Sequence, residues 1–161
     1  MRSFQKKLKF TYKKPPVIIA EISGNHNGNK SRFLKLIESA CKSGADLVKI
    51  QTYEPEDITL NSQNKDFLIN KKSPWGKHKN LWSLYSKAQT PLSWQKKLFD
   101  HANKIGIDIF SSPFSERAVD LLEKLNCKYY KLASPEINHI PLIEKIAKTN
   151  KPILISTGMA A

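Results

Sequence analysis

Five short apolar runs recur along the chain, and each becomes polar at its C-terminal end. They span residues 17–21, 47–52, 107–113, 129–136 and 153–158. A strand that is buried on both faces reads as continuous apolar sequence and turns polar only where it leaves the core. Parallel α/β proteins carry their chemistry at the carboxyl ends of their strands. A functional site is therefore expected where these five runs end.

Amphipathic helical segments separate most of the runs and define the fold class. Apolar residues recur at helical spacing near residues 31–43, 91–105, 115–125 and 141–147. Alternating strands and helices predict an α/β fold with a parallel sheet, either doubly wound or a (β/α)₈ TIM barrel. No glycine-rich phosphate loop follows the first run, which disfavours a dinucleotide-binding sheet. Because a barrel needs eight strands and roughly 250 residues, we expect the N-terminal five βα units of an incomplete (β/α)₈ barrel.

The remaining segments define the domain organisation. Residues 1–16 are rich in lysine, end in two prolines and are expected to form an N-terminal extension. Residues 17–161 then form one partial TIM-barrel domain. Within this domain, residues 53–89 are a long connection that is rich in Asn, Lys and Ser but carries several large apolar side chains. A connection of this length inside a compact domain is usually functional or partly helical.

Composition narrows the class of partner. The chain has 27 Lys and Arg against 14 Asp and Glu, which gives a formal net charge of +13, and nearly all of the basic residues are lysine. Nucleic-acid readers favour arginine and interleave aromatics along one face, so a solvated lysine-rich surface is the preferred interpretation. No apolar run is long enough to span a bilayer, and the N-terminus lacks a signal-peptide core. We therefore expect a cytoplasmic protein with no membrane partner, whose Cys41 and Cys127 stay reduced.

Two lysines stand among hydroxyls at the polar ends of the runs. Lys49 and Lys131 come from different runs, while Ser112, Ser134 and Ser156 supply hydroxyls at three of the ends. Lysine acts as a compact positive charge toward phosphate or carboxylate, and hydroxyls supply hydrogen-bond donors. The group therefore predicts a cradle for a small polyanion.

One carboxylate, Glu21, ends the first run and is the candidate for proton transfer. Each candidate also has a purely structural interpretation. Lys49 could form a salt bridge with Glu21, and Lys131 could extend its ammonium to the end of the barrel. The serines could satisfy turn backbones, and His26 could do no more than cap the loop after the first run.

Several of these motifs, taken together, resemble the sialic acid synthase family. They are AEISGNHNG at residues 20–28, VKIQTY at 48–53, FSSPF at 110–114, YKLAS at 130–134 and STGM at 156–159. Further motifs, ITLNS at 58–62, LWSLY at 81–85 and ASPEI at 133–137, are most similar to the pseudaminic acid synthase branch. The resemblance covers about residues 17–160, in order and at the spacing of the family.

This resemblance implies a TIM-barrel synthase that condenses phosphoenolpyruvate with an open-chain, N-acetylated amino-sugar aldehyde. The products would be a nine-carbon 2-keto-3-deoxy acid of the sialic acid type and inorganic phosphate. By the same analogy, Glu21 is the catalytic residue, and Gln51, Asn25, His26 and Tyr53 face the sugar. The residues that would hold phosphoenolpyruvate are Lys49, Ser112, Lys131, Ser134 and Ser156.

The resemblance also implies a divalent metal ion, Mn²⁺ or Mg²⁺, and a homodimer. In the family, the metal-binding histidines come from later strands, and a C-terminal antifreeze-like domain reaches across the dimer to close the partner's site. Neither feature is found in the sequence given. We therefore expect no metal ligand within these residues, and no activity from the 161-residue chain alone.

Two other functions stay open at this point. A Schiff-base aldolase on a similar barrel would use Lys131 or Lys49 as its nucleophile, and trapping with borohydride would reveal the covalent adduct. A non-catalytic basic module would bind nucleic acid with a steep salt dependence, although the scarcity of arginine argues against it.

Overall fold

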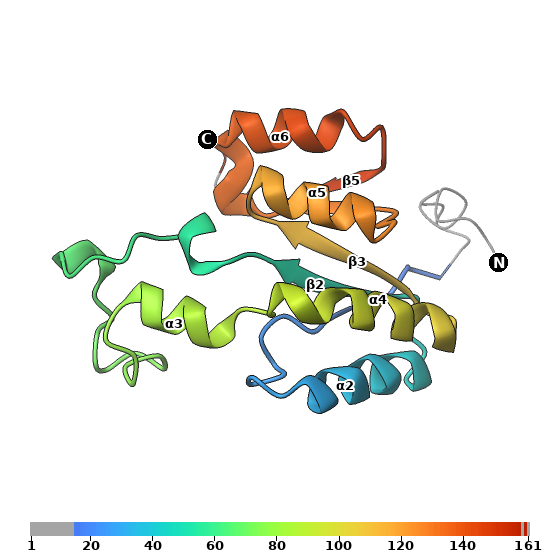
Figure 1. The fold of residues 1–161 in the computed structure, drawn as a ribbon, viewed down its shortest axis with the longest axis horizontal. Helices are drawn as coiled ribbons and strands as arrows, with labels where there is room; N and C mark the ends of the chain where they lie inside the picture. Colours follow the sequence, from blue (N-terminus) through green and yellow to red (C-terminus); the bar gives the residue numbers. More distant parts are fainter. Residues whose placement is uncertain (1–14, 159, 161) are drawn as a thin grey trace.

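The computed structural model describes residues 15–158 and 160, in which strands alternate with helices along the chain (Figure 1). Of the predicted extension 1–16, residues 1–14 lie outside the described residues. The strands are β1 (Ile19–Glu21), β2 (Leu47–Thr52), β3 (Asp108–Pro113), β4 (Tyr130–Leu132) and β5 (Ile153–Ile155). The α-helices are α2 (Lys30–Lys42), α3 (Leu81–Ala88), α4 (Leu92–Ile105), α5 (Glu116–Lys124) and α6 (Ile140–Ala147), and the 3₁₀ helices are η1 (Pro55–Asp57), η2 (Lys65–Phe67) and η3 (Ser134–Asn138).

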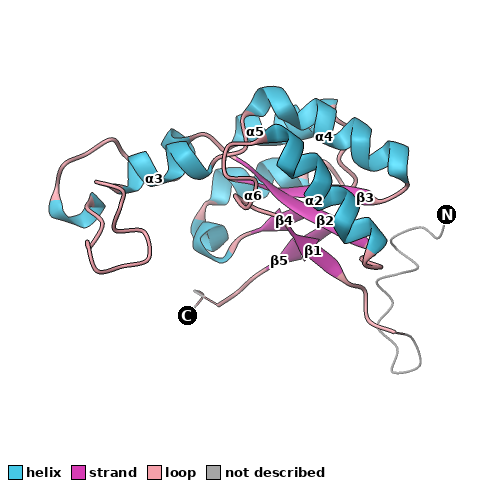
Figure 2. Ribbon diagram, turned by 90° about the horizontal axis from the view of Figure 1, so that it is seen from below, coloured by secondary structure: helices cyan, strands magenta, loops and turns pink. Residues whose placement is uncertain are grey.

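The five strands form one parallel sheet, in which they lie side by side in sequence order from β1 to β5. Figure 2 shows the sheet from a second side, with helices α2, α4 and α5 lying together along one face. Sequential order is that of a (β/α)₈ barrel, whereas a doubly wound sheet reverses its strand order part-way across. The described residues therefore form a partial TIM barrel of five βα units, which confirms the predicted fold class.

Alternation along β2 assigns one face of the sheet to the helices. Val48 and Ile50 are fully buried, whereas Lys49 and Gln51 are only partly buried. Thr52 continues the buried set, and its hydroxyl lies 2.9 Å from the amide oxygen of Gln95 on α4. Because successive strand residues point to opposite faces, Lys49 and Gln51 lie on the inner face, which in a closed barrel is the interior.

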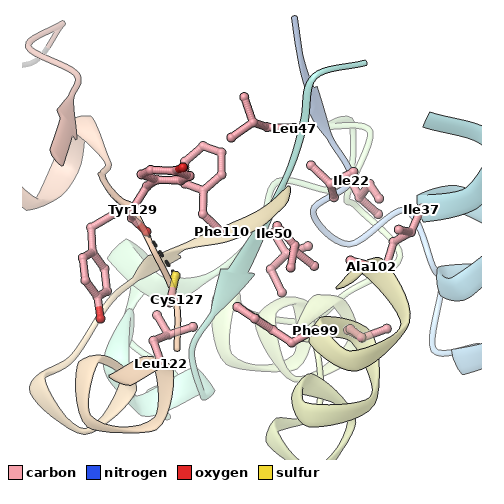
Figure 3. Close-up of a cluster of buried hydrophobic side chains, with 14 of the residues drawn as sticks. Ile22, Ile37, Leu47, Ile50, Phe99, Ala102, Phe110, Leu122, Cys127 and Tyr129 are labelled. Carbon is pink, nitrogen blue, oxygen red and sulfur yellow. Dashed lines mark hydrogen bonds between the residues drawn. The ribbon is translucent and has the colours of Figure 1, made fainter. Parts of the chain in front are cut away.

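The inner face is apolar near the start of the strands and polar near their ends. Leu47, Phe110 and Tyr129 have little or no exposure, and the rings of Phe110 and Tyr129 meet edge to face at 6.1 Å. Figure 3 shows this cluster on one side of β2 and β3, with Ile50 and Leu122 among the side chains on the other. On the inner face, the polar C-terminal ends of the strands therefore adjoin a layer of apolar side chains, which excludes water from that side.

The connection 53–89 is partly helical, as predicted, and is fixed to the barrel by rings and charges. The Tyr53 ring packs edge to face against Tyr85 at 6.1 Å and against Phe114 at 5.5 Å. On α5, the Arg117 guanidinium lies 2.9 Å from a carboxylate oxygen of Asp57 in η1. These contacts place α3 beside the C-terminal ends of the first strands.

Two expectations from composition can be compared with the structure. Within residues 15–158 and 160, no helix is both long enough and apolar enough to cross a membrane. Cys41 and Cys127 are both free. Burial raises the pKa of the Cys127 thiol to about 11, so this cysteine is a poor nucleophile and behaves as a core residue.

The outer strands present unpaired edges in the part of the chain that the structure describes. There, β1 pairs only with β2 and β5 pairs only with β4. Large apolar side chains beside these edges are exposed: Ile18 and Ile155 each retain 53% of their accessible surface. Open strand edges with exposed aliphatic residues favour association between chains.

We expect the 161-residue chain, expressed alone, to associate through these edges, and the double variant Ile18→Lys/Ile155→Lys to shift it toward monomer. Each aliphatic side chain left in water forfeits roughly 1.5–3 kcal/mol of burial free energy, against a net domain stability of about 5–15 kcal/mol. Light scattering measures the change. Leu60→Lys is the control, because Leu60 is 66% exposed but lies in the 53–89 connection. A monodisperse, cooperatively unfolding wild-type chain would contradict this expectation.

Candidate active site

Glu21 and Lys49 end up side by side because their strands pair in register. Their Cα atoms are partners in the β1–β2 ladder, and the Lys49 ammonium forms an ion pair with the Glu21 carboxylate. The second carboxylate oxygen of Glu21 accepts a hydrogen bond of 2.6 Å from the Ser23 hydroxyl. The salt bridge considered from the sequence is therefore present, and it holds the acid/base candidate next to one of the two lysines.

Ser112 joins this pair from β3. It stands opposite Gln51 in the β2–β3 register, is 2% exposed, and its hydroxyl lies 3.5 Å from the Lys49 ammonium. Three neighbouring strands thus place a carboxylate, an ammonium and a hydroxyl close together on the inner face, near the C-terminal ends of the strands.

Lys131 brings the second ammonium from β4. Its Cα pairs with Leu154 of β5, and its side chain donates to the backbone carbonyl of Leu132. Desolvation lowers the pKa of Lys131, and the positive charge of Lys49 lowers it further. The two ammonium groups are therefore close enough to repel each other, and an anion placed between them would relieve that repulsion.

Ser134 and Ser156 lie in the segments that follow β4 and β5. Ser134 begins η3, and a β-carbon built on Gly158 would stand 3.6 Å from its hydroxyl oxygen, so the two segments touch. The backbone N–H of Ser156 donates to the carbonyl of Leu132 at 3.2 Å. Both serines are partly buried, and they extend the polar edge past Lys131.

Glu136 belongs to the same edge, although the sequence assigned it no role. Within the described residues, one of its carboxylate oxygens is buried with no hydrogen-bond partner. Burial raises the pKa of Glu136, while the charges of His139 and Lys131 act in the opposite direction. Two sequence signals point to Glu136: its position at the end of the 129–136 run and its place in the ASPEI motif at 133–137.

His26 does not join the strand-end group. Its ring is fully buried, stacked on Phe33 at 4.9 Å and edge-on to Trp94 at 5.6 Å. The N–H of Gly28 donates to Nδ1 at 3.0 Å, and Nε2 lies 3.3 Å from the Thr90 hydroxyl. Burial lowers the pKa of His26, which keeps the ring neutral. Both ring nitrogens are thus engaged in holding the loop after β1, which matches the structural interpretation.

The other predicted sugar-side residues occupy different surroundings. Gln51 is partly buried on the inner face beside Ser112. Asn25 is exposed, and its side-chain amide donates to the carbonyl of Ile22 at 2.8 Å. Tyr53 is 3% exposed, and burial together with Tyr85 raises the pKa of its phenol to about 12. Tyr53 is therefore a neutral ring that anchors the 53–89 connection directly after Gln51 and Thr52.

Comparison with known proteins identifies the family of this chain. The sequence model of the NeuB family matches residues 36–161. The chain belongs to the NeuB family. This NeuB-family chain is 50% identical over 146 residues to a pseudaminic acid synthase of Helicobacter pylori, an alignment that covers 91% of the chain and 42% of that relative. It is also 40% identical over 147 residues to an N,N'-diacetyllegionaminic acid synthase of Campylobacter jejuni, covering 91% of the chain and 43% of the relative.

A solved structure supports the same fold for this NeuB-family chain. An N-acetylneuraminic acid synthetase of Leptospira borgpetersenii, in complex with citrate, superposes with a TM-score of 0.76 at 26% identity. The superposition covers 92% of this chain and 46% of that one. The family and the partial barrel predicted from the sequence are thus confirmed, and the chain spans less than half the length of these relatives.

The described residues do not form a metal centre. Among residues 15–158 and 160, no three histidine, cysteine, aspartate or glutamate side chains come close enough together to hold a metal ion. Glu21, the carboxylate nearest the cradle, is already engaged by Lys49 and Ser23. The ligands of the divalent ion that the resemblance implies are expected in later strands, so no chemical step is assigned to a metal within these residues.

The lowered pKa of Lys131 leads to a prediction about stability. The protein for this test is a chimera, in which these 161 residues replace the matching part of the Helicobacter pylori relative. A lysine whose pKa is lower in the folded state costs stability while it is charged, and the cost fades as pH rises through the lowered pKa toward the ordinary value of 10.5. Lys131→Met should therefore be more stable than wild type at pH 7, and the difference should shrink at alkaline pH.

Urea unfolding of both proteins at several pH values measures this difference. Lys42→Met, an exposed residue in the last turn of α2, is the control and should show no such pH dependence. A wild-type protein that is the more stable of the pair at pH 7 would show that Lys131 is stabilised rather than strained.

Proposed function

We propose that this chain supplies the phosphoenolpyruvate-binding half of a synthase barrel. The enzyme would join phosphoenolpyruvate to an open-chain N-acetylated amino-sugar aldehyde, giving a nine-carbon 2-keto-3-deoxy acid and inorganic phosphate. One observation carries the proposal: Lys49 and Lys131 extend from β2 and β4 on one face, with Ser112 of β3 between them. The NeuB-family membership, and relatives that make pseudaminic and legionaminic acids, support it.

Phosphoenolpyruvate suits this cradle because it carries a phosphate and a carboxylate on adjacent positions. Two ammonium groups neutralise part of that charge, and each charged hydrogen bond to a desolvated anion contributes roughly 1.5–3 kcal/mol. The hydroxyls of Ser112, Ser134 and Ser156 add neutral donors at the ends of three consecutive strands. Bound anion would also raise the pKa of Lys131 back toward its usual value, since it offsets the charge of Lys49.

Glu21 is the proposed proton-transfer group, and its ion pair with Lys49 suggests how it becomes available. When the substrate anion arrives, it competes with Glu21 for the Lys49 ammonium. Substrate binding would therefore switch Glu21 from a salt-bridge partner to an acid/base group at the reacting atoms.

The reaction then follows from the electron flow of the enol. The double bond of phosphoenolpyruvate supplies the electron pair with which C3 attacks the aldehyde carbon, forming the new C–C bond. The π bond of the aldehyde breaks at the same time, and its oxygen takes up a proton to become a hydroxyl. Water captures the cation left at C2 and loses a proton, and the resulting tetrahedral carbon expels phosphate to leave the keto group. Glu21 would move a proton at these oxygens, while the two lysines keep the phosphate and carboxylate in place.

Gln51 and Asn25 remain our proposed sugar-side contacts, with Tyr53 behind them as an anchoring ring. We assign His26 to supporting the loop that carries Asn25, because its ring nitrogens are engaged. The homodimer and the Mn²⁺ or Mg²⁺ ion stay predictions from the resemblance. The cytoplasmic location and the division into an extension 1–16 and a domain 17–161 stay predictions from the composition and residue pattern of the sequence.

A Schiff-base aldolase is the second candidate, and one observation favours it. A lysine with a lowered pKa, such as Lys131, is a better nucleophile toward a carbonyl group. Borohydride reduction of the chimera with pyruvate distinguishes the two, because only the aldolase would leave a stable adduct on Lys131 or Lys49. We expect no adduct, since in the proposed synthase both lysines bind the anionic groups of phosphoenolpyruvate as ammonium ions.

Lys49→Ala and Lys131→Ala in the chimera should each weaken phosphoenolpyruvate binding by about ten- to a hundredfold, because each removes a charged contact worth roughly 1.5–3 kcal/mol. Titration calorimetry measures the affinity. Lys42→Ala is the matched control, because Lys42 is exposed in the last turn of α2, just before the start of β2, whereas the site lies where the strands end. Unchanged affinity in both site variants would remove the cradle from the mechanism.

Glu21→Gln should act on turnover much more than on phosphoenolpyruvate affinity. The amide keeps the shape of the side chain but cannot take up a proton, and the loss of a general acid/base costs about 10²–10⁴ in rate. Phosphate release under saturating substrates gives the rate. Glu38→Gln, whose carboxylate faces His101 3.0 Å away on the helix layer, serves as control. Near-normal turnover would leave Glu21 as a structural partner of Lys49.

A further inference from the structure

A pocket of about 300 Å³ lies between the loop after β1 and the 53–89 connection, and none of the roles proposed above uses it as a whole. The loop side supplies Ser23 and Gly24 together with two asparagines. The opposite side comes from the segment before α3 and from α3 itself. The lining residues are Ser23, Gly24, Asn25, Asn27, Trp75, Lys77, His78, Leu84, Lys87 and Ala88.

The pocket adjoins the proposed proton-transfer group. Ser23, in its wall, donates its hydroxyl to Glu21 at 2.6 Å. The loop is also held tightly against α3, because a β-carbon on Gly24 would lie only 3.0 Å from the carbonyl oxygen of Ala88. A ligand whose reacting carbon is near Glu21 could therefore place a substituent of a neighbouring carbon past Ser23 in this pocket.

The chemistry of the walls selects the group that fits there. Most of the surface that lines the pocket is apolar, and the large apolar contributors are the Trp75 indole and Leu84. Its polar side chains all include a hydrogen-bond donor, and two of them, the ammonium groups of Lys77 and Lys87, can only donate. Among the described residues that line the pocket there is no carboxylate. A phosphate could accept hydrogen bonds from the donors, but its negative charge would lie against the apolar side chains of the pocket. An acetamido group matches both, since its methyl contacts carbon and its carbonyl oxygen accepts hydrogen bonds.

We propose that this pocket binds an N-acyl group of the amino-sugar acceptor, with Trp75 and Lys87 as specificity-determining residues. The identification of the acceptor rests on the proposed function, but the preference for an acyl group rests on the pocket. Trp75 is 57% exposed, so its indole face is open to a ligand. The Lys87 ammonium lies close to the turn at Gly28, 3.9 Å from a β-carbon built there, which places it beside the loop that forms the other wall.

NMR spectra of the chimera report on the pocket through the indole N–H signals of the chimera's tryptophans. N-acetylmannosamine should shift the Trp75 signal in a saturable manner, whereas mannosamine, which lacks the acyl group, and inorganic phosphate should not. Trp82 and Trp94 do not line the pocket and serve as internal references. Lys87→Met should weaken the response several-fold, whereas Lys79→Met, an exposed lysine outside the lining, should not.

The outcomes separate this proposal from the proposed function. A Trp75 shift produced by phosphate instead of the acyl sugar, or no shift with any of these probes, would overturn the acyl pocket. In turnover, Trp75→Ala should raise the KM for an N-acylated acceptor by about tenfold, as expected for a lost apolar contact in a specificity pocket, while the KM for phosphoenolpyruvate stays unchanged. If no phosphate is released with any acceptor, the proposed function fails, while a saturable acyl-specific shift would still support the pocket.

Discussion

Two ammonium groups on one face of the sheet are the constraint on which the rest of the site depends. Lys49 and Lys131 are separated by β3, and neighbouring strands are about 4.8 Å apart, so the two backbones stand roughly 10 Å apart and their long side chains can reach the same ligand. Glu21 offsets the charge of Lys49, whereas Lys131 is desolvated and repelled by its neighbour. Such an arrangement is stabilised by a small anion, and phosphoenolpyruvate carries two suitable groups.

The fold holds this costly arrangement through the opposite face of the same strands. The hydroxyl of Thr52 lies 2.6 Å from that of Ser111 and 2.9 Å from the amide oxygen of Gln95, which ties the ends of β2 and β3 to α4. These residues alternate with Gln51 and Ser112, so fixing one set also orients the other. Buried polar contacts of this kind specify a register that apolar packing alone would leave less certain.

Strand positions and their polar ends could be predicted from the sequence because a parallel strand is a local pattern. The placement of Lys49, Ser112 and Lys131 on three neighbouring strands follows once the strands and their sequential order are recognised. The setting of His26 could not be predicted, because its partners Trp94 and Thr90 come from a distant helix and its N-terminal flank. The pocket at Trp75 could not be predicted from the sequence either, because its walls depend on the path of the long 53–89 connection.

The most direct test of the central claim is a crystal structure of the chimera bound to phosphoenolpyruvate. The account predicts the phosphate and carboxylate within hydrogen-bond distance of the Lys49 and Lys131 ammonium groups and of the Ser112 hydroxyl. It also predicts that the Lys49 ammonium has moved from Glu21 toward the ligand. Phosphoenolpyruvate bound elsewhere, with the Glu21–Lys49 pair intact and Lys131 without contact to it, would contradict the account.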